Sequence, residues 1–166
     1  PHVLLEADNG RFVQIIHALR AELAFRQGFT SEAIKWAREY AFEPLKQSIR
    51  FFVPQLSQVK ILLAAGGASD REQAHDMINR MQQFFAAKHN VHCLIEVLAL
   101  KAICLDGKGE SEAAIEALTT ALKLAHPSRQ LEPFLSLGDQ MATLLKDVAR
   151  QGRFKGYVSE ILASIE

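Results

Sequence analysis

Three glycines at nearly regular spacing constrain this chain more than any other feature. Gly28, Gly66 and Gly109 each follow an apolar stretch and precede a polar one, at intervals of 38 and 43 residues. Glycine permits the left-handed conformation that ends a helix, and the polar residues after it favour a new helix start. A period of about 40 residues with this punctuation is typical of a repeated helix pair. The spacing therefore predicts a series of antiparallel helix pairs.

The positions aligned with these glycines carry small or apolar residues. The aligned sets are Ala21, Val59 and Ala102, and Ala24, Leu62 and Leu105; shortly after each glycine an alanine also follows in a helix, at Ala33, Ala74 and Ala114. Small residues let paired helices approach closely, and a helix pair buries its apolar face by stacking on a neighbouring pair. The sequence predicts an all-α fold in which antiparallel helix pairs stack into a right-handed superhelix with a concave face.

Apolar residues recur at helical spacing along the chain, and no segment alternates with period two, so we expect no sheet. One such stripe consists of Phe12, Ile15, Ile16, Leu19 and Leu23. We expect a single domain over 1–166, with first helices at 11–27, 54–65 and 92–106 and their partners at 30–42, 70–88 and 111–125. The repeats then cover 11–42, 54–88 and 92–125.

The helix ends carry further signals. Ser69 and Glu72 fit a capping box, in which each side chain bonds the other residue's backbone N–H. Pro54 is suited to the first turn of a helix. Closing helices are expected within 134–165, near 139–150 and 154–164, and they would cap the stack. Their inward-facing residues would be Met141, Leu144, Leu145 and Val148, covered by Tyr157, Ile161 and Leu162.

Composition excludes several classes of protein. The 19 basic and 19 acidic residues give a net charge of zero, which argues against direct nucleic-acid contact. No apolar stretch is long enough to span a bilayer, so we expect no membrane contact. Cys93 and Cys104 fall in one predicted helix, about 16 Å apart along its axis, too far for a disulfide. Two buried thiols suit a cytoplasmic protein.

The third helix pair resembles a tetratricopeptide (TPR) repeat, with Gly109, Ala114-Ile115, Ala121-Leu122 and Pro127 in its pattern. The wider pattern is more specific. The segments GFTSEAIKWAREY, LLAAGG, IEVLALKAICLDGKGESEAAIEALTTALKLAHP and LEPFLSLGDQMATLLKDVARQG follow one another in order. Together they look like the helical-repeat domain of large LuxR-family transcriptional activators of the MalT type. The resemblance runs from about Arg11 to Ser164.

This resemblance implies a position between an ATPase module and a helix-turn-helix DNA-binding domain, so the chain would be a fragment of a longer regulator. In that family the domain is thought to receive the inducer, a maltodextrin in the founding member, and to control self-association. The expected partner is therefore a small-molecule inducer or a regulatory protein. The chain has no phosphate-binding Gly-x-x-x-x-Gly-Lys-Ser/Thr motif, so we expect no cofactor in this segment.

Several residues allow two interpretations. His89, His92 and Cys93 are metal-ligand types, but they lack a partner motif, and Cys93 is more often a packed apolar residue. Trp36 could stack on a sugar, although a lone tryptophan on a second helix is usually core. Phe51-Phe52 could staple the turn before Pro54 or rim the groove. No nucleophile motif surrounds any serine, so we expect no enzyme.

In TPR-like stacks the first helix of each pair lines the concave face. The aligned positions predict a ligand-binding set there: Glu22, Phe25, Arg26, Lys60, Leu63, Glu96, Ile103 and Asp106. Mixed charges with one aromatic ring suit a polar small ligand or a peptide. The alternative is a solvated groove with pairs such as Glu22–Arg26. A second function also stays open, a TPR-type scaffold that binds a peptide or partner protein.

Overall fold

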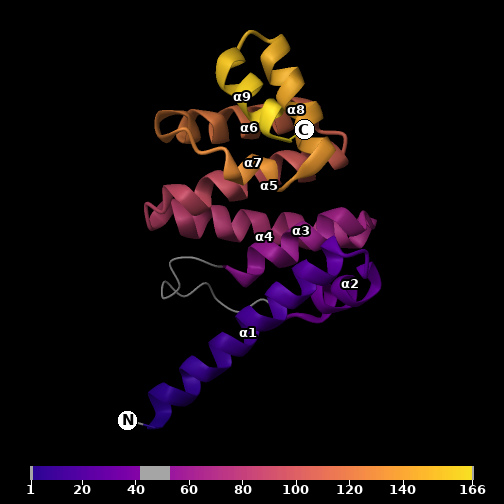
Figure 1. Cartoon of the computed structure of the whole chain (residues 1–166), viewed down its shortest axis with the longest axis vertical. Coiled ribbons are helices and arrows are strands. Elements are labelled where there is room, and N and C mark those ends of the chain that lie inside the picture. Colours follow the sequence, from indigo (N-terminus) through magenta and orange to yellow (C-terminus); the bar gives the residue numbers. More distant parts are fainter. Residues whose placement is uncertain (1, 42–52, 166) are drawn as a thin grey trace. The chain divides into compact units, whose positions relative to one another are not determined.

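The computed structural model describes residues 2–41 and 53–165, with side chains from residue 12 onward. All regular structure in these ranges is helical, which confirms the all-α prediction (Figure 1). The elements are α1 (His2–Arg26), α2 (Thr30–Glu39), α3 (Pro54–Ala65), α4 (Ala68–Ala87), α5 (Val91–Gly107), α6 (Ser111–Ala125), a 3-10 turn η1 (His126–Ser128), α7 (Glu132–Leu135), α8 (Gly138–Arg150) and α9 (Lys155–Ile165).

The predicted helix bounds agree best where glycine or proline marks an end. Helices α3 and α6 occupy the predicted ranges 54–65 and 111–125. Helix α1 instead begins at His2, nine residues before the predicted start at Arg11. The prediction failed there because a glycine inside a helix, here Gly10, costs only about 1 kcal/mol and does not end it. The predicted Phe51-Phe52 staple and most of the connection before Pro54 lie outside the described residues.

The three repeat glycines adopt the conformation that the spacing predicts. Gly28, Gly66 and Gly109 have φ angles of 89°, 73° and 81°. This left-handed region is open to glycine because it has no Cβ. At Gly66 the backbone N–H donates to the carbonyl of Leu62 and closes the last turn of α3. The glycine spacing of about 40 residues therefore corresponds to a structural repeat, in which a helix ends and the chain reverses direction.

The described chain divides into two compact units, residues 1–73 and 74–166, and α4 crosses the division. In the first unit α1, α2 and α3 pack against one another. Its core includes Val59, at one of the aligned positions, and Ala33, the alanine after Gly28; both are fully buried. The side-chain amide of Gln58 on α3 donates to the carbonyls of Ala37 (2.7 Å) and Tyr40 (3.0 Å) at the end of α2. Those bonds satisfy carbonyls that a helix C-terminus leaves without helical partners.

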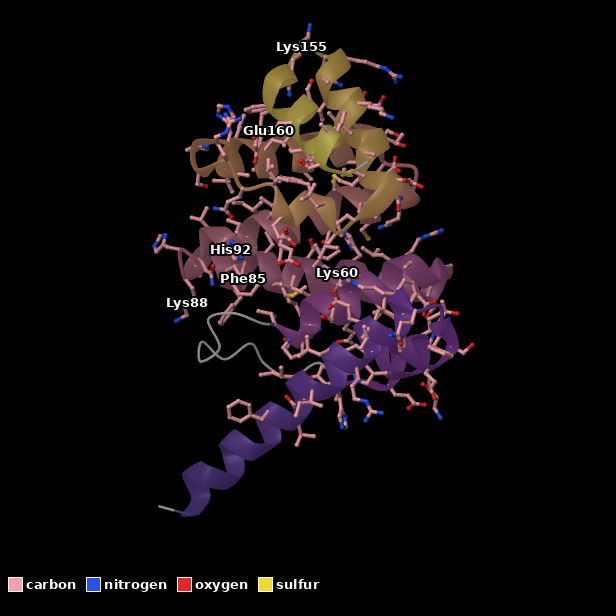
Figure 2. All side chains as sticks on the ribbon, in the orientation of Figure 1. Lys60, Phe85, Lys88, His92, Lys155 and Glu160 are labelled. Carbon is pink, nitrogen blue, oxygen red and sulfur yellow. The ribbon has the colours of Figure 1, made fainter. Side chains whose placement is uncertain are left out.

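The second unit is built on the α5–α6 hairpin, closed by α7, α8 and α9. The predicted inward face of α8 is confirmed, since all four of its residues are buried: Met141, Leu144, Leu145 and Val148. Tyr157 and Ile161 of α9 are also buried, while Leu162 is only half-buried. The Tyr157 hydroxyl donates to the carbonyl of Gln130, and Arg129 pairs with Glu160, so α9 is held against the segment before α7. Glu160 is labelled in Figure 2.

Both cysteines are buried thiols in α5, as predicted. The 17-residue helix holds them on one continuous axis, and a disulfide between them would require that helix to break. Burial raises the pKa of the Cys93 thiol, and the nearby Glu96 carboxylate raises it further. Within residues 2–41 and 53–165, no helix combines the length and apolar character that a bilayer crossing requires.

Candidate binding surfaces of the helical repeat

Part of the predicted ligand-binding set forms a charged edge on α1 and α3 of the first unit. Glu22 accepts hydrogen bonds from the Ser57 hydroxyl (2.8 Å) and from the Arg26 guanidinium (3.0 Å). The Glu22 side chain is 21% exposed and that of Arg26 is 66% exposed. The serine therefore fixes the carboxylate across the two helices, and the carboxylate orients a guanidinium that stays open to solvent.

The neighbouring residues of this edge are half-buried. Phe25 lies on α1 and Leu63 on α3. Lys60, labelled in Figure 2, also lies on α3. Lys60 comes three residues after Ser57, so the two share a face of α3. Two cations, one anchored carboxylate and an aromatic ring thus lie on two packed helices. Such a surface can orient a polar ligand through charge-assisted hydrogen bonds.

The remaining three predicted residues lie on α5 in the second unit. Glu96 and Asp106 are half-buried, and Asp106 accepts a long hydrogen bond from the Gln140 side chain on α8 (3.5 Å). Ile103 is only 6% exposed and packs in the core of its unit. The repeat alignment places an acid or a base at this register in the earlier pairs, but α5 carries an apolar residue there. A binding role for the full predicted set stays a prediction.

A groove between α1 and α2 lies outside the predicted site. Its volume is about 430 Å³. It is lined by His17, Arg20, Ala21, Leu23, Ala24, Gln27, Phe29, Glu32, Ala33 and Trp36. Trp36 is half-buried here, and its ring centroid lies 5.2 Å from that of Tyr40, so the ring packs on its own helix while it also lines the groove. The sequence signal for this groove was Phe29, a large apolar residue placed in a turn.

The candidate metal ligands near the start of α5 each have a separate structural role. Asn90 caps α5 by accepting a hydrogen bond from the Cys93 backbone N–H (3.1 Å). His92 Nδ1 lies 2.9 Å from the Gln130 side-chain oxygen, and His89 adopts a left-handed φ of 52° in the turn. Among the residues that the structure describes, no three His, Cys, Asp or Glu side chains gather as a metal site would require.

An ion pair missed by the sequence interpretation joins α2 to the start of α4. Arg38 donates two hydrogen bonds of 2.8 Å to the Asp70 carboxylate, which is 5% exposed. The Arg38 interaction lowers the pKa of Asp70, burial opposes it, and a backbone hydrogen bond from Gly67 adds to the lowering. The predicted Ser69–Glu72 capping box is therefore wrong: α4 begins at Ala68, which puts Asp70 in the third helical position. From there its carboxylate reaches back to the N–H of Gly67.

These observations define the class of protein. Helix pairs closed by left-handed glycines, with buried alanines in their second helices, form an all-α helical repeat of the TPR type. The family model for the MalT-like TPR region matches residues 5–151, and the chain belongs to this family. No curated protein and no solved structure gives a significant match to the chain.

Proposed function

We propose that this chain is the effector-binding and oligomerisation region of a cytoplasmic, MalT-type transcriptional regulator of the LuxR family. The observation that carries the proposal is the match to the MalT-like TPR region over residues 5–151. In this proposal the segment is not catalytic and holds no cofactor. An inducer or a regulatory protein binds it and shifts the population between resting and self-associated states, which requires different affinities for the two states.

The charged edge of α1 and α3 is the proposed contact surface in the first unit. Arg26 is exposed and already oriented by Glu22, so an anionic or hydroxyl-rich ligand meets a donor whose geometry is fixed before binding. Less conformational entropy is then lost on binding. The exposure of the cation also means that its removal does little to the fold, so ligand effects and stability effects can be separated.

A thermal-shift screen against sugars, amino acids, aromatic acids and nucleotides tests the proposal. A ligand at 100 times its dissociation constant stabilises the native state by about 2.7 kcal/mol. For a domain of this size that raises the melting temperature by roughly 5–11 °C. Arg26→Ala should reduce the shift, whereas Arg153→Ala, which removes an exposed arginine from the second unit, should leave it unchanged.

Each outcome of the screen tests a different part of the proposal. A shift that survives Arg26→Ala at full size removes the charged edge from the proposal. The absence of any shift across all four ligand classes overturns effector binding by this chain. A second function, the TPR-type scaffold for a protein partner, is then favoured by a specific observation: large apolar side chains stand exposed on α1 and in the turn after it, including Phe12 and Phe29.

A further inference from the structure

One face of α1 is apolar and exposed. Its four members, here called the α1 stripe, are Phe12, Ile16, Leu19 and Leu23, and their exposed fractions run from 48% to 63%. The spacing of four, three and four residues keeps all four on one side of the helix. Spacing of this kind is the pattern by which one helix packs along another. The sequence predicts an amphipathic helix here, but the buried side of α1 is formed by Ala18 and Ala21 instead.

Among the described residues, the positions equivalent to the α1 stripe in the later helix pairs are buried. Aligning Gly28 with Gly109 places the α1 stripe on four residues of α5, all of them buried: Cys93, Val97, Leu100 and Cys104. Aligning Gly28 with Gly66 places Leu19 and Leu23 on Ser57 and Ile61 of α3, exposed by 2% and 1%. The described residues equivalent to the stripe are therefore buried in α3 and α5, the first helices of the second and third pairs, and exposed only in α1.

A polar position next to the stripe shows which helix packs on the equivalent residues in the later pairs. On α5 the Lys101 ammonium donates to the Gln82 side chain of α4 (2.8 Å), which places the second half of α4 beside α5. The equivalent residue on α3 is Gln58, which donates to the carbonyl of Ala37 in the last turn of α2. In both cases a donor at this position bonds the second helix of the preceding pair. The equivalent residue of α1 is Arg20, also a donor and exposed.

We infer that the α1 stripe docks a partner helix that takes the place of the second helix of a preceding pair. The partner is an amphipathic α-helix with apolar residues at spacings of three and four. It presents a carbonyl or a side-chain oxygen to Arg20. Helix α4 gives the template, since its residues Met77, Ile78, Met81 and Phe85 are buried. The inference does not depend on the proposed effector, because none of the stripe residues, nor Arg20, belongs to the charged edge of Glu22, Phe25, Arg26, Lys60 and Leu63.

The groove between α1 and α2 fits this partner and supplies a reporter. Leu23 of the stripe and Arg20 both line the groove, and so does Trp36. Trp36 is the single tryptophan of the chain. A helix seated on the stripe would cover the mouth of the groove and remove water from the indole. The emission of the protein should then shift to shorter wavelength.

The test uses a probe taken from the repeat itself. A synthetic peptide of residues 68–87 contains neither tryptophan nor tyrosine, so Trp36 emission reports its binding to the whole chain. A tethered form places residues 68–90 directly before residue 10, which reproduces the α4–α5 connection and raises the effective concentration of the helix to about the millimolar range. The expected result is a saturable blue shift with the peptide, and a blue shift with a higher melting temperature in the tethered form.

Two charge substitutions separate docking from non-specific adhesion. Leu19→Glu places a carboxylate in the stripe and should weaken peptide binding about tenfold or more, because the charge would lose its water on docking. Val91→Glu changes another exposed apolar residue, 44% exposed in the second unit, and should leave binding unchanged. Because Leu19 is 48% exposed, its variant should keep the helical circular dichroism of the parent.

Three outcomes would overturn the inference. One is a tethered helix that changes neither Trp36 emission nor the melting temperature. Another is a Leu19→Glu variant that binds the peptide as tightly as the parent. The third is sedimentation of the chain alone as a dimer that Leu19→Glu converts to a monomer, since the stripe would then be occupied by a second copy of the chain.

Discussion

At the residue scale, Asp70 shows how one carboxylate can serve a helix end and an ion pair together. It is buried, it receives two hydrogen bonds from Arg38, and it accepts a third from the backbone of Gly67. An added Cβ at Gly67 would lie 2.5 Å from the Asp70 Oδ2 atom, so the carboxylate sits directly on the backbone that precedes α4. A larger residue at this position would force the Asp70 carboxylate to shift relative to Arg38.

The lowered pKa of Asp70 gives stability a defined pH dependence. The folded state holds this carboxylate ionised more strongly than the unfolded state does, so the unfolded state binds more protons in acid. The stabilisation is fully present above the usual carboxyl pKa of about 4 and is lost as the pH falls through the lower folded value. Asp70→Asn should cost about 1 kcal/mol at neutral pH, since one partner of the pair stays exposed.

Urea unfolding at several pH values checks this prediction. The difference in unfolding free energy between the parent and Asp70→Asn should shrink as the pH falls from about 6 to about 3. Asp76→Asn changes an exposed carboxylate on the same helix and serves as the control. A difference that stays constant over that range would show that Asp70 acts through packing and not through its charge.

A residue's role can be predicted from the sequence where it depends on backbone conformation alone. It cannot be predicted where it depends on a side chain that is distant in the sequence. The left-handed turn at Gly66 follows from the residue type itself. The role of Asp70 depends on Arg38, 32 residues earlier, which no local pattern reveals. The two interpretations of Trp36 stay open for the same reason. Its exposure depends on whether another element covers the groove between α1 and α2.

At the element scale, buried alanines near the start of the second helices leave little side-chain volume between neighbouring helices. Ala33, Ala74 and Ala114 lie in the first two turns of three successive second helices, and each is fully buried. Around Ala114 the neighbouring positions of α6 are filled by larger side chains such as Leu118 and Leu122. A close-packed interior of this kind has no space for additional methyl groups.

Enlarging one of these alanines should therefore destabilise the fold. Ala114→Leu is expected to lower the unfolding free energy by about 1–3 kcal/mol, because the added carbons force neighbours from their preferred rotamers. Ala86→Leu, at an exposed position near the end of α4, should change it by less than about 0.5 kcal/mol. Chemical denaturation of both variants gives the comparison. Equal effects would mean that α5 and α6 are not in close contact at Ala114.

At the scale of the whole molecule, the repeat pattern predicts which positions are equivalent but not which of them are covered. Leu19 and Leu100 occupy the same register, yet one is 48% exposed and the other is fully buried. Burial in a stacked repeat depends on the neighbouring pair, and the sequence of a single pair carries no information about that neighbour. The same limit applies to the binding set: the alignment selects Glu22, Lys60 and Ile103, but only the first two keep an accessible side chain.

The balanced charge of the molecule yields the last prediction. A protein binds duplex DNA without sequence preference by releasing counterions from phosphates, which requires a surplus of basic groups. Here 19 basic residues face 19 acidic ones, and the exposed arginines Arg26, Arg129 and Arg150 each pair with a carboxylate. This chain at about 10 µM should therefore leave the anisotropy of a labelled duplex unchanged at about 50 mM salt. Binding that weakens linearly with the logarithm of salt concentration would contradict the prediction and assign DNA contact to the repeat itself.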